Sequence, residues 1–462
     1  MRRFSLLLFL VLWAACVRRD DLVRPDEPTY GEPGFTPRED PHADSASSAS
    51  EEQLRENGAD AYLPQAMVRP QVVGAVLPLT GKYQLLGEAV LRGIRLALQD
   101  SEIELELVVK DSQGDATLAA KLVEELTLND GAIAIIGPML DEDSRRAALV
   151  AERLRVPILT LAKTPEITAI GPHVFRNMLT DAQQAQALAQ YATKTLGFRS
   201  FAVLYPNIPF GVDLAKEFQA QVVARGGAIR VAGSYSPAQT TFTAEARSLV
   251  GHFGPERRKR SGRATYPLVD FEALFIPDSW QRVSLVTPAL AAEDIITNVC
   301  DPDELERIRR ASRRKYLRTV TLLGTNTWSS PKGRSDMPEL VARGGKFVLC
   351  SVYVDGFFVD SERPATQRFV EEFRAEYEDA QPTLLDAIGY DAMGMVRHVI
   401  EQDRPVSRAG FRANLAALRD FDGATGDTHF NERREAIKPL FFLTIDAEGI
   451  REISPDEGPS GS

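Results

Sequence analysis

The side chains that most often carry out catalysis or bind metals do not occur in reactive spacings in this sequence. Its five histidines are His42, His173, His252, His398 and His429. They are scattered, and none belongs to an H-E-x-x-H motif or another close ligand spacing, so we expect no metal site. A G-x-S-x-G nucleophile elbow is also absent, which disfavours a serine hydrolase of the α/β type. We therefore expect no catalytic residue and no cofactor.

The loop that follows the first apolar run offers groups for binding a small ligand. The stretch VVGAVLPLTGKYQLLG at 72–87 breaks at Pro78, and its glycines suit a tight turn before a helix. It lacks the G-x-x-x-x-G-K-[ST] spacing of a phosphate-binding loop, and no G-x-G-x-x-G motif follows the strand. Thr80 and Tyr83 would instead present a hydroxyl group and an aromatic ring to a ligand.

Polar and aromatic residues follow most of the other apolar runs as well. Those that we expect to contact a ligand are Asp143, Ser144, Ala162, Lys163, Thr164, Phe210, Trp280, Thr325 and Asn326. Small-molecule clefts are commonly built from loop groups that are held on rigid sheets. Each of these residues also has a simpler interpretation as a helix cap or a turn residue. That interpretation is favoured for Ser144, Thr164 and Asp278 taken individually.

Apolar runs alternate with amphipathic helical patterns from the first strand onward. Continuous apolar strands separated by helices predict parallel sheets that are covered on both faces. Because ligands bind beyond the carboxyl ends of such strands, the loops named above should gather there. A second series of the same kind begins after 173–176, so we expect two similar lobes with a cleft between them. The first lobe would comprise about 70–177 and 355–419, and the second about 178–354 and 420–453.

Length and charge limit the class of protein. At 462 residues, the chain is too long for one ordinary core. Its 44% hydrophobic and 26% charged residues are typical of a globular protein, and a formal charge of −11 disfavours nucleic acid as a partner. Basic clusters at 257–263 and 307–318 are interpreted as solvated surfaces. The alternative is contact with an anionic partner, such as lipid head groups or cell-wall polymer.

The N-terminus, 1–16, has the pattern of an export signal. Two arginines precede a short apolar run, 4–13, which is too short to span a bilayer permanently. Cys16 directly follows two alanines, which resembles the cleavage box of bacterial lipoproteins and would make Cys16 the lipidated first residue. The alternative is an ordinary export signal with an incidental cysteine. Residues 17–69 are rich in Pro, Asp, Glu and Ser, so we expect a disordered tether there, and 454–462 should form a disordered tail.

Two further cysteines, Cys300 and Cys350, follow this export signal. The oxidising compartment that the signal implies permits a disulfide between them. Two separate buried thiols are the alternative, because the sequence does not show whether the two residues approach each other.

Five stretches between about 71 and 450 carry a family resemblance. They are VGAVLPLTGKYQLLGEAVLRGIRLAL, AIIGPMLDEDSRRAALVAERLRVPILTLAKTPEIT, FRNMLTDAQQAQALAQYA, AVLYPNIPFGVDLAKEFQAQVVARGG and AIGYDAMGMVRHVIE. In order and spacing they resemble type I periplasmic binding proteins, which include the leucine/isoleucine/valine-binding lipoproteins of ABC importers. The resemblance implies an α/β fold of two Rossmann-like lobes with parallel sheets, joined by hinge strands and closing on a ligand like a Venus flytrap.

A second resemblance concerns the segment RRKRSGRATYPLVDFEALFIPDSWQRVSLVTPALAAEDI at 257–295. It looks like a segment of penicillin-binding-protein activators, where a basic loop, an apolar strand and a helix with an L-x-x-P-x-L pattern occur together. Those proteins share the fold, and they are outer-membrane lipoproteins that act on peptidoglycan synthases by contact, without an ABC permease. This resemblance implies a penicillin-binding protein as a partner.

Two positions depart from the pattern of amino-acid binders. Acidic residues at 141–143 begin a helix where the family carries small hydroxyl residues, and they would repel a ligand carboxylate. Lys163 stands where a small hydroxyl residue usually contacts the ligand. We therefore keep two functions as near equals: capture of a small polar, amino-acid-like or peptide solute for an ABC-type importer, which is slightly favoured, and regulation of a wall synthase by contact. Both place the protein in the periplasm on a lipid anchor, with the outer membrane favoured over the inner membrane.

Overall fold

The computed structural model describes residues 68–250, 269–297, 299, 302–312, 317–332, 337–378 and 380–458. All of them belong to the compact unit that spans Leu54–Ser462. The export signal with Cys16, most of the expected tether, the basic cluster at 257–263 and Cys300 lie outside the described residues.

The first sheet has five parallel strands in the order β2-β1-β3-β4-β5. Their bounds are Glu106–Asp111, Arg69–Leu77, Ala132–Ile136, Ile158–Thr160 and Val174–Arg176. Val73, Ala75 and Leu77 of β1 pack in one apolar cluster, whereas Val72 and Val76 pack in another. Successive side chains of a strand point to opposite faces, so β1 is covered on both sides, as its continuous apolar sequence predicts.

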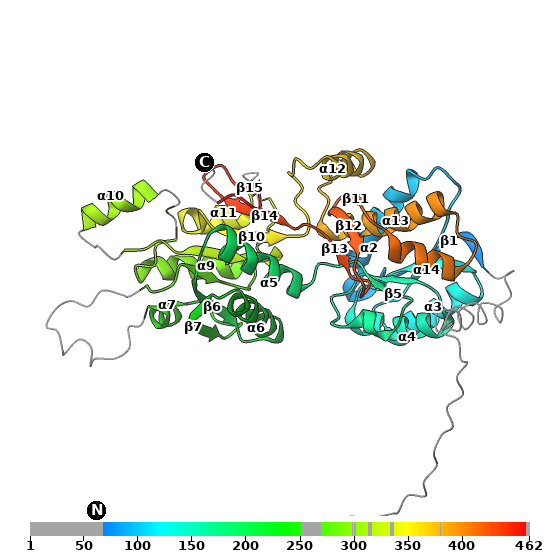
Figure 1. Cartoon of the computed structure of the whole chain (residues 1–462), viewed down its shortest axis with the longest axis horizontal. Helices are drawn as coiled ribbons and strands as arrows, with labels where there is room; N and C mark the ends of the chain where they lie inside the picture. The colour runs from blue at the N-terminus through cyan, green and yellow to red at the C-terminus, as the bar shows by residue number, and fades with distance from the viewer. Residues whose placement is uncertain are drawn as a thin grey trace, which may run out of the picture. The chain divides into compact units, whose positions relative to one another are not determined.

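Helices cover both faces of this sheet (Figure 1). One apolar cluster joins β1 to α2, α13 and α14, and the other joins it to α3 and α4. The bounds are α2 Gln84–Gln99, α3 Ala116–Leu128, α4 Asp141–Leu154, α13 Leu384–Asp403 and α14 Arg408–Ala417. Helix α13 begins with a capping box, in which the side chains of Thr383 and Asp386 satisfy each other's backbone N–H groups.

Two glycines let α2 and α13 cross closely. A Cβ atom on Gly93 would overlap the carbonyl oxygen of Asp386, and one on Gly389 would overlap that of Val90. At the same crossing, Arg92 Nε donates to Asp386 Oδ1 at 2.9 Å. The late helix is therefore built into the first lobe, although 294 residues separate Arg92 from Asp386 in the sequence.

The second sheet has seven strands and is mixed, in the order β15-β14-β10-β9-β8-β6-β7. Their bounds are Ile450–Ile453, Phe441–Ile445, Val352–Asp355, Thr321–Gly324, Ala273–Phe275, Ser200–Pro206 and Ala228–Tyr235. Strands β7, β6, β8, β9 and β10 run parallel, as expected. Strand β14 pairs antiparallel with both β10 and β15. The last two strands form a hairpin, and a short connection of this kind joins only antiparallel neighbours.

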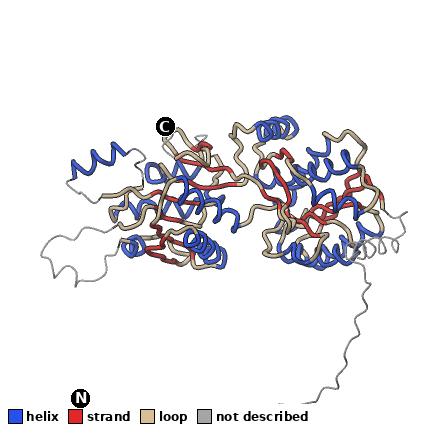
Figure 2. The backbone as a smooth tube through the Cα atoms, in the orientation of Figure 1, coloured by secondary structure: helices blue, strands red, loops and turns tan. Residues whose placement is uncertain are grey.

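Helices α5 and α6 pack on one face of β6, and α7 and α9 pack on the other (Figures 1 and 2). The bounds of the helices around this sheet are α5 Asp181–Gln190, α6 Pro209–Ala224, α7 Thr243–Leu249, α9 Trp280–Ala292, α10 Pro302–Ser312 and α11 Glu339–Gly344. Helix α5 continues directly into a π-helical turn, η4, Tyr191–Thr195. There the hydroxyl of Tyr191 donates to the carbonyl oxygen of Glu457 at 2.6 Å.

A small antiparallel sheet, β11-β12-β13, departs from the expected lobe boundaries. Its strands span Phe421–Gly423, Gly426–Phe430 and Ala436–Ile437. We expected 420–453 in the second lobe, but Phe430 and Ala436 pack in the apolar cluster of the first sheet. The ring of Phe430 meets that of Phe175 edge-on at 5.2 Å between centroids. Only the part from β14 onward joins the second sheet.

Helix α12, Pro364–Glu376, lies with the first-lobe helices, because Phe369 and Phe373 pack against Leu96 and Ala387. The chain therefore passes between the two sheets three times, near 177–180, 356–363 and 438–440. In the part of the chain that the structure describes, no helix is both long and apolar enough to cross a bilayer.

Candidate functional site

Hydrogen bonds between neighbouring loops close the carboxyl edge of the first sheet. Thr80 Oγ1 donates to Asp111 Oδ2 at 2.7 Å, and Leu79 N donates to Asp111 Oδ1 at 2.8 Å. Burial raises the pKa of Asp111, but hydrogen bonds from Thr80, Gln113 and Leu79 outweigh it and leave the pKa below its ordinary value. An ionised carboxylate at the end of β2 thus holds the loop after β1 in place.

Tyr83 lies half-buried beside this edge. A Cβ atom on Gly114 would come within 2.9 Å of its ring, so the ring packs on the turn after β2. Lys82 Nζ lies 5.0 Å from the ring centroid. Gly87, in the first turn of α2, permits the close approach of the helix to the loop, because a Cβ atom there would overlap the carbonyl oxygen of Pro78. Gly114 and Gly87 therefore permit close packing around the loop that carries Tyr83.

Asp143 and Ser144, in the first turn of α4, are both buried. Asp143 is 3% exposed, and Ser112 Oγ donates to its Oδ2 at 3.5 Å. Burial raises the pKa of Asp143; the hydrogen bond from Ser112 opposes this effect, and the charges of Asp115 and Glu142 add to it. The Oγ of Ser144 has no hydrogen-bond partner in the described residues. Acidic side chains thus occupy the positive end of the helix dipole.

The three candidate residues after β4 are engaged in different ways. Ala162 is fully buried. Lys163 Nζ donates to Asp181 Oδ1 at 3.1 Å, which links this loop to the first residue of α5. Thr164 Oγ1 donates to Asp141 Oδ1 at 2.8 Å. The Thr164 hydroxyl therefore supports the start of α4, while Lys163 reaches the first helix of the second lobe.

Thr325 and Asn326 follow β9 at the carboxyl edge of the second sheet. Thr325 is fully buried, and its Oγ1 lies 3.0 Å from Thr327 Oγ1. Thr327 Oγ1 donates to the carbonyl oxygen of Asp278 at 2.7 Å, so Thr325 is the donor in the pair of hydroxyls. The backbone N–H of Asn326 donates to Gln184 Oε1, on α5, at 2.9 Å. This edge is thus a connected polar network.

Phe210 and Trp280 are both half-buried, but they pack on different faces of the second sheet. Phe210 packs against the cluster that contains α5 and α6, and Trp280 packs against the cluster that contains α7 and α9. The guanidinium carbon of Arg343 lies 5.2 Å from the centroid of a Trp280 ring. The structure therefore does not place these two rings in one aromatic contact.

Asp355, at the end of β10, was not among the candidate residues. It is 4% exposed, and Ser329 Oγ and Gly356 N donate to its carboxylate. Burial raises the pKa of Asp355 to about 7, although these hydrogen bonds and the charge of Lys163 act in the opposite direction. An acidic residue directly after the apolar run SVYV was the available sequence signal. Gln184 was also missed, because it lies within an ordinary helical pattern.

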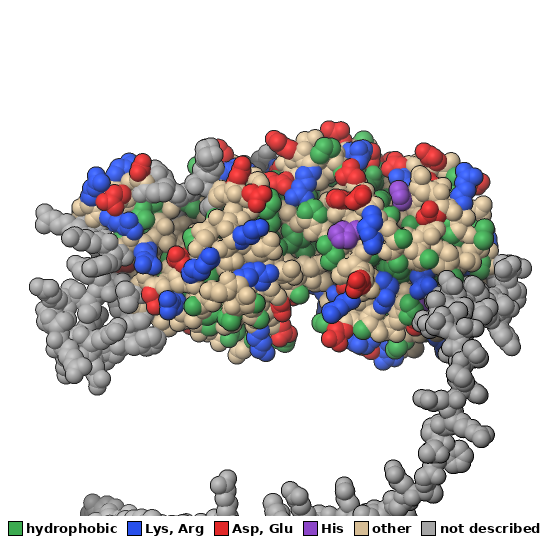
Figure 3. Space-filling view, viewed as in Figure 1, with side chains coloured by type: hydrophobic (Ala, Val, Ile, Leu, Met, Phe, Trp, Pro, Cys, Tyr) green, Lys and Arg blue, Asp and Glu red, His purple; other side chains and the backbone are tan. Residues whose placement is uncertain are grey.

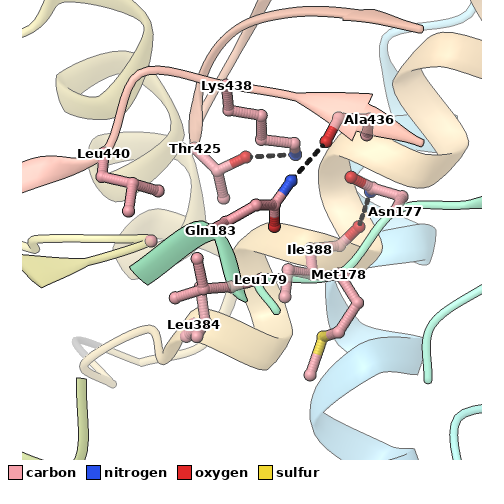
Figure 4. A pocket seen from close by; sticks show the side chains of 11 residues that line it. Asn177, Met178, Leu179, Gln183, Leu384, Ile388, Thr425, Ala436, Lys438 and Leu440 are labelled. Atoms are coloured by element: carbon pink, nitrogen blue, oxygen red, sulfur yellow. Dashed lines mark hydrogen bonds between the residues drawn. The ribbon is translucent and has the colours of Figure 1, made fainter. Parts of the chain in front are cut away.

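A small cavity lies where the connections between the lobes meet (Figure 4). Its volume is about 20 Å³, which is room for one water molecule. Its lining residues are Asn177, Met178, Leu179, Gln183, Gly356, Leu384, Ile388, Thr425, Ala436, Lys438 and Leu440. Gln183 Nε2 donates to the carbonyl oxygen of Ala436 at 2.9 Å, and Lys438 Nζ lies 3.3 Å from Asp391 Oδ2. Polar contacts therefore tie α5, α13 and the third connection together beside the cavity.

Charged side chains of both signs lie together on the described surface. On the face drawn in Figure 3, the described Lys and Arg side chains are interspersed with Asp and Glu side chains. Among the described residues, no group of three or more His, Cys, Asp or Glu side chains is arranged to hold a metal ion. Helix α10, which carries part of the 307–318 basic cluster, has acidic residues in its first turn.

Comparisons with known proteins identify related sequences. A family model described as "Periplasmic binding protein" matches residues 70–252 and 334–450. The chain is 29% identical over 169 residues to Glutamate receptor 2.7 of Arabidopsis thaliana, covering 33% of this chain and 17% of the receptor. It is 28% identical over 182 residues to Leu/Ile/Val-binding protein homolog 3 of Brucella melitensis biotype 1, covering 37% of this chain and 49% of the homolog. It is 26% identical over 148 residues to Penicillin-binding protein activator LpoA of Glaesserella parasuis serovar 5, covering 32% of this chain and 24% of the activator. The chain thus matches less than half the length of each of these relatives.

Solved structures share the fold over most of the chain. A putative branched-chain amino acid ABC transporter protein from Rhodospirillum rubrum superposes with a TM-score of 0.68 at 23% identity, covering 83% of this chain and 99% of that one. An ABC transporter substrate-binding protein from Desulfitobacterium hafniense in complex with Leu gives a TM-score of 0.55 at 20% identity, covering 83% of this chain and 99% of that one.

Proposed function

Because the chain belongs to the periplasmic binding protein family, we propose that it captures a small polar solute as the substrate-binding component of an ABC-type importer. The solute is held between the carboxyl edges of the two sheets, and no catalytic step takes place. The proposed contacts come from the loops at both edges: Thr80, Tyr83, Asp143, Ser144, Ala162, Lys163, Thr164, Phe210, Trp280, Thr325 and Asn326.

The ion pair between Lys163 and Asp181 is the observation that carries this proposal. Its N–O distance is 3.1 Å, and it joins a loop at the edge of the first sheet to the first helix of the second lobe. Both side chains are about one third exposed, at 36% and 31%. A solute that enters here meets one cation and one anion, which suits a small polar molecule with groups of both signs.

The ligands of related proteins support the same class of solute. The Desulfitobacterium hafniense protein was solved in complex with Leu, which supports an amino-acid-like solute for this chain. The acidic start of α4 disfavours a carboxylate at that position, so the solute is oriented differently or lacks a carboxylate there.

A thermal-shift screen of the purified full-length chain against amino acids, short peptides and other small metabolites tests the proposal. A solute at 100 times its Kd adds about 2.7 kcal/mol to the free energy of unfolding, so a binder raises the melting temperature by several degrees. The variant Lys163→Ala should lower the affinity for such a solute, whereas Lys121→Ala, on an exposed face of α3, should not. A broad screen without any stabilising solute would contradict the proposal.

We propose further that the protein acts in the periplasm on a lipid anchor at Cys16, preferably in the outer membrane. The Leu-Trp-Ala-Ala-Cys sequence at 12–16 supports lipidation. Replacing Cys16 by Ser should move the protein from the membrane fraction to the soluble fraction after cell breakage. Retention of the variant in the membrane fraction would show that another segment anchors it.

Regulation of peptidoglycan synthesis is the second candidate, favoured by the similarity to Penicillin-binding protein activator LpoA. Pull-down with the full-length chain should then recover a penicillin-binding protein. Reversing the charges at 257–260, a basic cluster outside the described residues, should weaken that recovery. Reversal of the exposed pair Arg145 and Arg146 on α4 is the matched control. Failure to recover any such synthase would leave solute capture as the remaining candidate.

A further inference from the structure

Two amide side chains at the edge of the second sheet have hydrogen-bonding capacity that the protein does not use. Gln184 is fully buried, and its Nε2 has no hydrogen-bond partner in the described residues. The buried Oδ1 of Asn326 has no partner there either. Buried polar groups are nearly always hydrogen-bonded to protein, water or ligand. One donor and one acceptor therefore require an external partner.

The backbone fixes the orientation of the Gln184 amide. The N–H of Asn326 donates to Gln184 Oε1 at 2.9 Å. An NH₂ group cannot accept this bond, so the opposite end of the amide is the NH₂ donor. The same hydrogen bond makes the two residues direct neighbours, and we call Gln184 and Asn326 the amide pair. A bound group would have to accept from the first residue and donate to the second.

The amide pair lies near the carboxyl edges of the sheets, where the solute is proposed to bind. Asn326 comes two residues after the end of β9. Gln184 and Asp181 are three residues apart on α5, so they lie on the same face of that helix. Asp181 accepts from Lys163, at the edge of the first sheet, at 3.1 Å. Gln184 is therefore on the face of α5 that Lys163 contacts.

Neighbouring polar groups are already used within the protein. Thr325 donates to Thr327, and Thr327 donates to the carbonyl oxygen of Asp278. Ser329 donates to the carboxylate of Asp355. These hydroxyl groups are thus satisfied within the protein, whereas Gln184 Nε2 and Asn326 Oδ1 have no partner among the described residues.

We propose that the amide pair binds a neutral amide group of the solute, which is a carboxamide or a peptide bond. The carbonyl oxygen accepts from Gln184 Nε2, and the N–H group donates to Asn326 Oδ1. An ionised carboxylate offers no donor for Asn326 Oδ1. This inference rests on the proposed solute-binding function and adds the chemical class of one ligand group.

Calorimetric titration of the full-length chain with three probes tests the inference. Propionamide represents a carboxamide, N-acetylglycine N-methylamide represents a peptide bond, and propionate is the charged isostere of the first. A site built around buried hydrogen-bonding groups strongly rejects analogues that lack them. We expect at least one amide to bind about 100-fold more tightly than propionate. If neither amide bound more tightly than propionate, the inference would be overturned.

The variant Gln184→Glu keeps the oxygen that accepts from Asn326 and replaces the Nε2 donor by a second carboxylate oxygen. It should weaken amide binding by about 100-fold. The uncharged variant Gln184→Met should weaken it as well, and thermal melting of both variants reports whether they fold. Gln186→Glu makes the same change at an exposed position of α5 and should leave binding unchanged. Unchanged amide binding in both folded Gln184 variants would refute the role of this residue.

The outcomes separate this inference from the proposed function. If other solutes stabilise the chain and neither amide probe binds, the amide inference fails and solute capture stands. If no solute in the metabolite screen binds, the proposed function fails as well. A crystal structure grown with propionamide that shows only an ordered water between Gln184 and Asn326 would also overturn the inference.

Discussion

The carboxylate of Asp355 is buried at the end of β10, and its protonation makes stability depend on pH. Burial raises the pKa of Asp355 from 3.8 to about 7 in the folded chain. The folded state binds the proton of Asp355 more tightly than the unfolded state does. The stabilisation that this proton gives is therefore complete below about pH 4 and is lost as the pH rises through about 7. The difference between the two pKa values corresponds to about 4 kcal/mol. The side chains that interact with the Asp355 carboxylate are Lys163, Tyr353 and Ser329.

The variant Asp355→Asn should remove this pH dependence. Its Oδ1 can still accept from Gly356 N, and its Nδ2 can donate to Ser329 Oγ. The unfolding free energy of the variant relative to the wild type should therefore be higher at pH 8 than at pH 5, by about 2.5 kcal/mol, because part of the effect is already present at pH 5. Denaturant titrations at the two pH values measure it. Asp213→Asn, at a highly exposed position of α6, serves as the control and should show no such difference. A relative stability of Asp355→Asn that does not change with pH would contradict the assignment.

For individual residues, sequence patterns predicted which loops carry polar groups, but they did not predict which hydrogen bonds those groups form. Thr164 was named both as a ligand contact and as a cap or turn residue, and its hydroxyl donates to Asp141 at the start of α4. Gln184 was missed because its partner, Asn326, is 142 residues away in the sequence. Helical periodicity reports which residues of α5 are buried, but it does not report which distant backbone group a buried amide will meet.

Among the elements, α2 and α13 depend on a close crossing that only glycine permits. A Cβ atom on Gly93 would overlap the carbonyl oxygen of Asp386, which is backbone and cannot rotate away. The variant Gly93→Ala should therefore separate the helices and lower the free energy of unfolding by about 3 kcal/mol or more. Denaturant unfolding measures this loss.

Gly410→Ala on α14 is the matched control for this helix crossing. The nearest atom to a Cβ there is the Oγ of Ser407 at 3.3 Å, and it belongs to a side chain. Alanine also has the higher helix propensity, so the control should change stability by less than about 1 kcal/mol. If both variants lost the same stability, close packing at Gly93 would not be the cause.

The whole molecule shows why the fold was predictable and one boundary was not. Alternation of apolar strands with amphipathic helices is a local signal, and it predicted two sheets with helices on both faces. The assignment of 420–437 depended instead on which sheet a short hairpin joins. Phe430 packs against Phe175, far away in the sequence, and the alternating burial of β12 is the same whichever lobe covers it. Packing between residues that are far apart in the sequence does not produce a periodic pattern of apolar residues.

The disulfide bond of Cys350 is a covalent cross-link that affects the stability of the whole molecule. Cys350 is 5% exposed and disulfide-bonded, and the chain contains two other cysteines, Cys16 and Cys300. Lipidation would occupy the thiol of Cys16, so we predict that Cys300 is the partner. A bridge between positions 300 and 350 closes a loop of about 50 residues, which corresponds to about 4 kcal/mol in the chain-entropy account.

Cys300→Ser and Cys350→Ser should therefore lower the free energy of unfolding by the same amount, about 4 kcal/mol. A reductant should destabilise the wild type to that level and leave both variants unchanged, because neither retains the bridge. Cys16→Ser, assayed in parallel, should keep the full stability and its sensitivity to reductant. If Cys16→Ser behaved like Cys350→Ser and Cys300→Ser did not, the partner would be Cys16, and the lipid anchor would have to be reassigned as well. One set of three serine variants thus tests the cross-link and the anchor together.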